Sequence, residues 1–445
     1  MRHTTSSNFP TKEGLKREIG IWGLTSNIIN VVIGSGIFVL PALVSQGLGA
    51  AGILAYLFCG FLITIIMLCF AEVGSKVTLT GGAYAYIEAA FGEYFGFLTT
   101  NLFIFGASLM ATAAVANALA DTLSYMLPVF KEKAFRAVFF LILFSGLTIV
   151  NVRGVKQGIT LVKLTTIAKL APLLLLVIWG STQISLQNLK WDKVPSLPSF
   201  GSVSLILFFA FQGAENSLSV SGEVQNPKKT IPRAIFLSLL VIILLYIAVQ
   251  LVAQGILGDA FPRYKAAPLA EVAKRIMGPF GATLMILGAC ISMFGYLSGD
   301  ILNMPRVLFR SAKDGVIPIK ALAFIHPRFS TPYVSVIAFT TLGCLLAITG
   351  EFKQLAILSS SSVLLIYLGV ALAVIKLRIK DQADSPSFKI PGGYLVPVLA
   401  VITILVFLSN LTKAEIVGML FTLVVLSLLF YLLKYLKTLR ARMVK

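Results

Sequence analysis

Long apolar runs recur from residue 20 to residue 436, and they constrain the fold more than any other feature. A bilayer core of about 30 Å needs about 20 apolar residues for each helical crossing. Helices satisfy their own backbone polar groups, so such runs predict an all-α integral membrane protein. We expect twelve transmembrane helices, at 20–45, 49–72, 96–127, 134–152, 159–180, 203–222, 233–257, 279–302, 332–350, 354–376, 394–411 and 416–436.

The placement of charge along the chain predicts its orientation. Only 12% of the residues are charged, yet the net charge is +19. With the N-terminus inside, about two-thirds of the 37 Lys and Arg residues fall in inner loops and tails, the usual bias of membrane proteins. The first 18 residues are polar and lack the pattern of a cleaved signal peptide. We therefore expect both termini in the cytoplasm and a bacterial plasma-membrane location, with no nucleic acid partner.

Several chemical classes find no support in the sequence. The four cysteines lie in apolar runs without metal-ligand spacing, and the two histidines are far apart, at Cys59, Cys69, Cys290, Cys344, His3 and His326. No GxxxxGK[ST] string is present for nucleotide binding. A channel would need a ring of charges or a carbonyl-filter string, which we do not find. We expect no metal, no cofactor and no enzyme activity.

Two predicted spans carry interruptions at matching positions. The first span holds Gly34-Ser35-Gly36, and the sixth holds Gln212-Gly213 before Glu215. Gly weakens a helix by about 1 kcal/mol relative to Ala, and clustered Gly favours a break. Spans one and six each begin a group of five, and matching breaks in two halves are typical of inverted-repeat transporters. Alternatively, the glycines only permit close helix packing.

This grouping predicts the organisation of the chain. Short amphipathic helices on the membrane surface are expected within 73–95, 264–278 and 305–325. The expected units are a tail at 1–18, a first repeat at 19–180, a second repeat at 203–376, two further helices within 394–436 and a tail at 437–445.

A broken helix exposes backbone groups that a small charged solute can satisfy. The N–H groups that begin the second half-helix suit a carboxylate, and the carbonyls that end the first suit an ammonium. By position, Ser35, Gly36 and Ile37 would supply N–H groups, while Ile33 and Phe211 would supply carbonyls. The pattern favours a zwitterion such as an α-amino acid and leaves its side chain open.

Four segments then carry a family resemblance: GSGIFVLP (34–41), FAEVGSKVTLTGGAYAYIEAAFG (70–92), GEVQNPKKTIPRAI (222–235) and GYLSGDILNMPRVLFRSAKDGVIP (295–318). In this order they resemble the amino acid–polyamine–organocation superfamily. The resemblance implies a LeuT-like five-plus-five inverted repeat with broken helices 1 and 6, alternating access, and a G-S-G stretch that binds the substrate carboxylate and amine. It also implies an aromatic gate at Phe209 or Phe211. Phe209 stands where arginine/agmatine antiporters have tryptophan, which disfavours arginine.

Three ionisable residues are expected at bilayer depth, where each is costly and therefore a functional candidate. The resemblance implies that the Lys169 ammonium fills the position of sodium in sodium-coupled relatives; desolvation favours its neutral form, which would let it exchange protons. A structural cation is the alternative. Asp300 could meet a cationic substrate group, pair with Lys169, or be satisfied by solvent and backbone. Glu215 is expected to accept hydrogen bonds from backbone N–H groups beside the sixth-span break.

Together these features predict sodium-independent secondary transport of amino acids, by proton symport or by exchange. The alternative is a polyamine or diamine carrier, or an amino acid–amine antiporter, in which Asp300 and Glu215 bind ammonium groups. The expected partners are the substrate, protons and lipid, and oligomeric state is left open. The candidate substrate residues are Ile33, Ser35, Gly36, Ile37, Phe209, Phe211, Gln212, Gly213 and Asp300, with Lys169 and Glu215 for coupling or gating.

Overall fold

A computed structural model describes residues 19–77, 82–153, 159–191, 194–218, 224–313, 315–329, 331–380 and 388–443. Within these residues the chain is helical, apart from connecting loops and one isolated bridge between Ile19 and Val224. Nine helical segments in this part are long and apolar enough to cross a membrane, and three shorter apolar helices accompany them. The all-α, multi-pass membrane class is therefore confirmed, while the count of twelve crossings stays a prediction.

The helices follow the apolar runs of the sequence. Their bounds are α1 Ile21–Val32, α2 Gly36–Leu48, α3 Gly52–Lys76, α4 Ala83–Phe91, α5 Glu93–Asn101, α6 Leu109–Ser124, α7 Lys133–Arg153, α8 Ile159–Gly180, α9 Leu197–Leu207, α10 Ala214–Ser217, α11 Pro227–Leu257, α12 Pro268–Lys313, α13 Tyr333–Thr349, α14 Phe352–Lys380, α15 Leu395–Leu408 and α16 Lys413–Met443.

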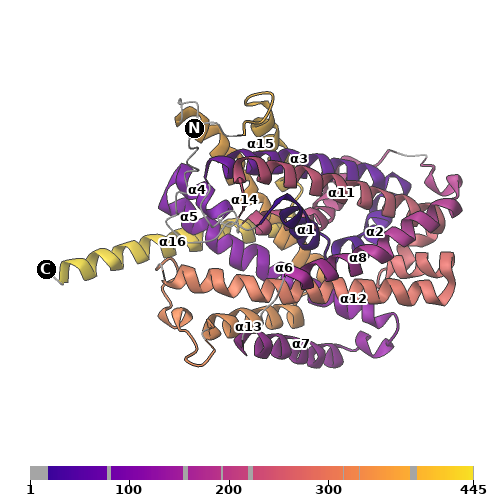
Figure 1. The fold of residues 1–445 in the computed structure, drawn as a ribbon, viewed down its shortest axis with the longest axis horizontal. Helices are drawn as coiled ribbons and strands as arrows, with labels where there is room; N and C mark the ends of the chain where they lie inside the picture. Colours follow the sequence, from indigo (N-terminus) through magenta and orange to yellow (C-terminus); the bar gives the residue numbers. More distant parts are fainter. Residues whose placement is uncertain are drawn as a thin grey trace, which may run out of the picture.

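The short helices α1 and α2 lie at the centre of the bundle (Figure 1). α1 packs against α11, α8 and α10, and α2 packs against α9 and α12. Most side chains of α2 are buried. In contrast, α16 extends away from the bundle and exposes large apolar side chains along its length (Figure 1). Such a surface is compatible with lipid, which solvates apolar side chains without cost.

Two segments differ from their sequence-based prediction. The third predicted span is not a regular α-helix, because a π-helical stretch, η2 (Leu102–Ser108), joins α5 to α6. The segment 305–325 was predicted as one surface helix, and this is wrong for its first part. Pro305 lies inside α12, which continues to Lys313. Only the short turn η9 (Lys320–Ala323) follows it within this segment.

One end of the bundle is fastened by a buried ion pair. Glu72 on α3 is 1% exposed and accepts a hydrogen bond from Nε of Arg378 on α14 at 2.7 Å. Its Oε2 also accepts from the guanidinium Nη2 of Arg378 and, at 2.9 Å, from the backbone N–H of Ile390. The carboxylate therefore joins α3, α14 and the segment before α15.

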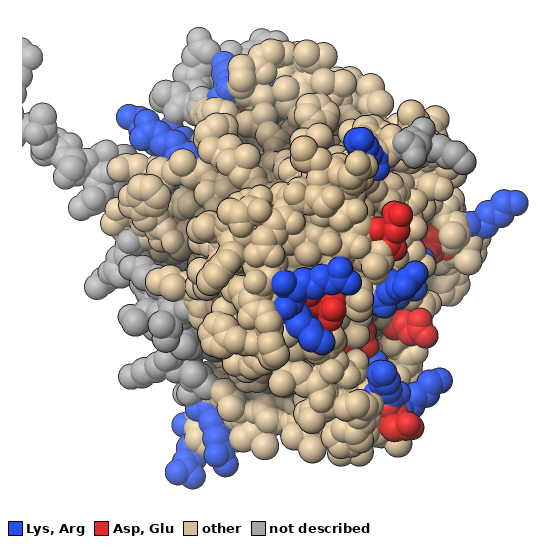
Figure 2. All heavy atoms as spheres, turned by 90° about the vertical axis from the view of Figure 1, so that its right-hand side faces the viewer, with Lys and Arg blue, Asp and Glu red and all other residues tan. Residues whose placement is uncertain are grey.

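The opposite end, which faces the viewer in Figure 2, carries acidic and basic side chains close together. Arg136 at the start of α7 pairs with Asp121 on α6 at 2.5 Å. Tyr125, just beyond α6, donates to Oε2 of Glu271 on α12 at 3.0 Å. Burial, together with this hydrogen bond, raises the pKa of Tyr125 to about 12, so the link persists at neutral pH. These contacts hold α6 against α7 and α12 at this end.

Candidate functional site

The chain leaves helical geometry between α1 and α2. α1 ends at Val32 and α2 begins at Gly36, with Ile33 at ψ 82° between them. Gly36 is required by packing: a Cβ added there would lie 2.6 Å from Cα of Ala210 in η6 (Phe208–Phe211). The absence of a side chain at Gly36 therefore lets the first interruption approach the second.

The carbonyls at the end of α1 are held by side chains from three other helices. Nζ of Lys169 on α8 donates to the carbonyls of Asn30 at 3.0 Å and Ile33 at 2.9 Å. Oγ of Ser292 on α12 donates to the carbonyls of Ile33 at 3.1 Å and Gly34 at 3.2 Å. The hydroxyl of Tyr246 on α11 donates to the carbonyl of Val32 at 3.3 Å. Because carbonyls in a dry interior need donors, these side chains stabilise the end of α1.

The N–H groups at the start of α2 have no such partners. Within the described residues, the backbone N–H groups of Ser35, Gly36 and Ile37 make no hydrogen bond. The buried hydroxyl of Ser35 also lacks one. The first N–H groups of a helix carry a partial positive charge and attract anions. This point of the structure therefore offers donors for a negatively charged group.

The second interruption lies between η6 and α10. Gly213 has φ +111°, a conformation that L-residues rarely adopt, and α10 begins at Ala214. Oε2 of Glu215 accepts from the backbone N–H of Gly213 at 3.0 Å and from the hydroxyl of Tyr367 on α14. Glu215 thus meets a backbone N–H group at the break, in the type of contact that the sequence suggested.

Gln212, at the same interruption, is fixed by two serines of α14. Its Nε2 donates to Oγ of Ser360 at 2.7 Å, and its Oε1 accepts from Oγ of Ser359 at 3.3 Å. Ser359 also reaches the carbonyl of Ala107 in η2 at 3.0 Å. The second interruption is therefore tied to α14 and η2 by hydrogen bonds.

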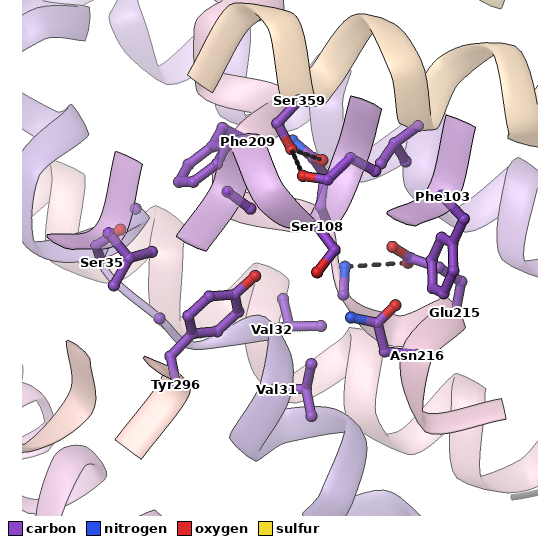
Figure 3. Close-up of a pocket in the computed structure, with 18 residues that line it drawn as sticks. Val31, Val32, Ser35, Phe103, Ser108, Phe209, Glu215, Asn216, Tyr296 and Ser359 are labelled. Atoms are coloured by element: carbon purple, nitrogen blue, oxygen red, sulfur yellow. Dashed lines mark hydrogen bonds between the residues drawn. The ribbon is translucent and has the colours of Figure 1, made fainter. Parts of the chain in front are cut away.

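A small cavity lies between the two interruptions (Figure 3). Its volume is about 40 Å³, room for about three water molecules. Residues from α1, α2, α6, η2, η6, α10, α12 and α14 enclose it. The lining residues are Val31, Val32, Gly34, Ser35, Gly36, Phe103, Ala107, Ser108, Ala111, Val115, Phe209, Gln212, Gly213, Glu215, Asn216, Tyr296, Ser359 and Val363.

The predicted site residues divide into two groups. Six of them line the cavity: Ser35, Gly36, Phe209, Gln212, Gly213 and Glu215. The others lie outside the lining: Ile33, Ile37, Phe211, Asp300 and Lys169.

The residues outside the lining have other neighbours. The ring of Phe211 packs edge-on against Tyr56 and Tyr246, with centroids 6.5 and 5.1 Å apart. Of the two candidate gate residues, only Phe209 therefore faces the cavity. The suggested pairing of Asp300 with Lys169 is not found, because the Lys169 ammonium is bonded to α1 carbonyls.

Three lining residues that carry hydroxyl groups escaped sequence reasoning. Ser108 ends the π-helical stretch and Ser359 lies on α14; Tyr296 lies on α12, and Figure 3 shows its hydroxyl pointing into the cavity toward Ser108. Tyr296 precedes Asp300 by four residues, so helical spacing places both on one face. That spacing could have identified Tyr296, and the run of four serines at 359–362 could have pointed to Ser359, whereas Ser108 carries no distinctive local signal.

Comparison with known proteins relates the chain to one family of transporters. A family described as amino acid permease matches residues 19–433. Three curated proteins of Bacillus subtilis are each 28% identical to the chain: the serine/threonine exchanger SteT, the branched-chain amino acid permease BcaP and a methylthioribose transporter. The alignments cover 87%, 95% and 90% of this chain, and 89%, 94% and 89% of the respective relatives.

Proposed function

Because this chain belongs to the amino acid permease family, we propose that it is a secondary active transporter that carries neutral amino acids by alternating access. The names of SteT and BcaP, a serine/threonine exchanger and a branched-chain amino acid permease, support this substrate class. The methylthioribose transporter shows that relatives at the same identity differ in substrate. The proposal that the substrate is an amino acid therefore rests on the hydrogen-bonding groups of the site.

The observation that carries the proposal is the set of unbonded donors at the start of α2. Three successive N–H groups, from Ser35 to Ile37, and the hydroxyl of Ser35 make no hydrogen bond among the described residues. Leaving buried donors unsatisfied costs about 1–3 kcal/mol each. A substrate carboxylate would satisfy them and would also interact favourably with the α2 dipole.

We place the substrate ammonium at the second interruption. The carbonyl of Ile33 already accepts from Lys169 and Ser292, and Phe211 lies outside the cavity lining, so neither of the two predicted carbonyls is the best partner for the ammonium. The carboxylate of Glu215 lies on the same side of the cavity. Phe209 and Gly213 would then contact the substrate from η6 and α10, while Gln212 would keep that wall in place through the α14 serines.

A small, uncharged side chain fits this cavity best. A volume of about 40 Å³ leaves little room beyond the zwitterionic head group in this conformation. Among the described residues no Lys or Arg lines the cavity, and Oε2 of Glu215 already accepts two hydrogen bonds. The polyamine or diamine alternative, which needs carboxylates free for several ammonium groups, is not favoured by the site or by the relatives.

The finer architecture is part of the same proposal. We assign twelve crossings, with repeats at 19–180 and 203–376 and two additional helices within 394–436. The tails 1–18 and 437–445 would be cytoplasmic, and the protein would lie in the plasma membrane. The charge bias of the loops and the matching interruptions at 33–35 and 212–213 support this arrangement.

Lys169 supports transport without sodium. Its ammonium bonds to two carbonyls at the end of α1, where a small cation would otherwise be needed to neutralise their partial negative charge. The coupling would then be proton symport or amino acid exchange. In exchange the substrate gradients determine the direction of net flux, and in symport the proton gradient contributes as well; neither mode uses a sodium gradient.

Reconstituted vesicles test this function. Vesicles loaded with one unlabelled neutral amino acid should take up the labelled form faster than empty vesicles, and replacing sodium by choline should leave the rate unchanged. A panel of amino acids and diamines would then rank the substrates. Failure of every amino acid to drive counterflow, or a strict need for sodium, would contradict the proposal.

A further inference from the structure

Three buried carboxylates among the described residues differ in the donors that they meet. Glu72, Glu215 and Asp300 are 1%, 5% and 6% exposed. Glu72 meets the guanidinium of Arg378 and a backbone N–H, and Glu215 meets a backbone N–H and a tyrosine hydroxyl. A guanidinium or backbone N–H can only donate, so each favours an ionised carboxylate.

Asp300 is the exception, because its recorded donors are hydroxyls that can also accept. Its Oδ2 accepts from Oγ of Ser108 at 2.7 Å and from Oγ1 of Thr112 at 2.5 Å. A hydroxyl has one donor hydrogen and two acceptor lone pairs, and it can rotate to use either. Ser108 and Thr112 can therefore donate to the carboxylate or accept from the carboxylic acid without moving a helix.

The charged neighbours of Asp300 do not fix its ionised form. Among the described residues no ion pair reaches it. Lys169 on α8 is bonded to carbonyls at the end of α1, and Arg136 on α7 pairs with Asp121 of α6.

The remaining titratable groups close to Asp300 are a phenol and an acid. Tyr296, one turn earlier on α12, interacts electrostatically with both Asp300 and Glu215. Glu215 is acidic and disfavours a second negative charge nearby. On the other elements packed against this part of α12, the stretch η2 carries no Asp, Glu, Lys, Arg or His, and neither do α2 and α13. The surroundings of Asp300 thus favour binding of a proton.

Ser108 connects Asp300 to the cavity. Ser108 lines the cavity, while Asp300 lies behind it and outside the lining. While Asp300 is ionised, the Ser108 hydrogen is used in the bond to Oδ2. Once Asp300 is protonated, that hydrogen can turn toward a substrate in the cavity. Proton binding and substrate binding are then linked, and each raises the affinity for the other.

We infer that Asp300 carries the proton that accompanies the substrate, through a hydroxyl relay formed by Ser108 and Thr112. This inference rests on the proposed function and narrows its coupling mode to proton symport. The proton comes from water that enters the cavity on one side and returns to water on the other, so no bond other than O–H is made or broken. One proton accompanies each neutral substrate, and transport moves one positive charge.

Proteoliposomes with an imposed pH gradient test the inference. With one proton per neutral substrate, an inward gradient of one pH unit can drive about tenfold accumulation. The wild-type protein should approach this ratio and acidify the lumen, as an enclosed pH dye reports. Asp300→Asn, which cannot titrate, should show measurable counterflow but an accumulation ratio near one and no acidification. Asp121→Asn, an acid of α6 away from the cavity, is the matched control and should still accumulate substrate and acidify the lumen.

The outcomes separate the inference from the proposed function. Wild-type vesicles without counterflow would contradict amino acid transport itself. Counterflow without any proton movement, or acidification that persists in Asp300→Asn, would overturn the role of Asp300 while leaving exchange intact. Accumulation driven by sodium instead of protons would overturn it as well.

A second variant decides the question if Asp300→Asn does not fold. Thr112→Val keeps the carboxyl group and the volume but removes one of the two donors to its anion. Protonation should then occur at higher pH, because the ionised form has lost a stabilising hydrogen bond. The pH at which uptake is half-maximal should rise by about one unit. An unchanged midpoint would overturn the relay.

Discussion

The two interruptions beside the cavity are stabilised in different ways. At 33–35, side chains from α8, α11 and α12 donate to the carbonyls of α1. At 212–213, the nearby Glu215 accepts from the backbone of Gly213, and α14 holds both Gln212 and Glu215. The first interruption therefore depends on α8, α11 and α12, whereas the second depends on its own residues, on α14 and on Tyr246 of α11, whose hydroxyl also donates to the carbonyl of Ala210 at 3.0 Å. The difference implies that movements of α8 and α12 act on the first break, and movements of α14 on the second.

Removal of the Lys169 ammonium should have the largest effect. Lys169→Met keeps the length of the side chain but leaves the carbonyl of Asn30 without this donor in a dry interior. We expect a loss of about 3 kcal/mol in the free energy of unfolding, measured by denaturant titration in detergent micelles. Lys353→Met, at an exposed position, is the control and should change stability little. A Lys169→Met protein as stable as the wild type would show that the first interruption does not depend on α8.

Substitution of Gly36 should have the second-largest effect on stability. It tests whether transport needs the close contact between the two interruptions. Gly36→Ala places a Cβ 2.6 Å from Cα of Ala210 and should cost about 2 kcal/mol and most of the uptake. Gly146→Ala on α7 is the matched control, because nothing lies within 4 Å of the Cβ that it would add and the residue is away from the cavity. Equal uptake by the two variants would mean that the contact between the interruptions is not needed for transport.

The backbone of the second interruption should tolerate substitution somewhat better. Gly213→Ala must adopt φ near +111° and brings its Cβ to 3.0 Å from Cγ1 of Val31. The expected cost is about 1–2 kcal/mol, from backbone strain rather than from lost hydrogen bonds. Denaturant titration measures it. A Gly213→Ala protein that matches wild-type stability would show that this stretch can change its conformation without strain.

The smallest effect is expected at the contact between Glu215 and α14. Tyr367→Phe removes one hydroxyl donor from the carboxylate and leaves the N–H bond of Gly213 in place. We expect a loss of about 1 kcal/mol, and exchange uptake should slow more than substrate affinity falls, because α14 is then less firmly linked to α10. A larger stability loss than that of Lys169→Met would reverse the comparison between the two interruptions.

Sequence reasoning located the interruptions because Gly and polar residues are conspicuous within apolar runs. It named Ser35, Gly36, Gln212 and Gly213, all of which line the cavity. It could not choose between Phe209 and Phe211, because the choice depends on the geometry of the turn in η6.

The residues from other helices were harder to predict. Ser108 looks like an ordinary small residue in a membrane helix, and the four serines at 359–362 do not reveal which of them faces the cavity; tertiary packing brings Ser108 and Ser359 there. The π-helical stretch that ends at Ser108 has no simple signature in the hydrophobic pattern. Sequence reasoning left three roles open for Asp300, as a partner of a cationic substrate group, as a partner of Lys169 or as a group satisfied by solvent and backbone, because the sequence does not show that Ser108 and Thr112 donate to it.

Competition by head-group analogues tests the central claim most directly. In counterflow with a labelled neutral amino acid, we would add the unlabelled parent, its carboxamide or its des-amino acid to the outside of the vesicles. If the donors of Ser35, Gly36 and Ile37 hold a carboxylate and the second interruption holds an ammonium, only the parent should compete. Competition by the carboxamide as strong as that by the parent would contradict the assignment of the interrupted helices as the amino acid site.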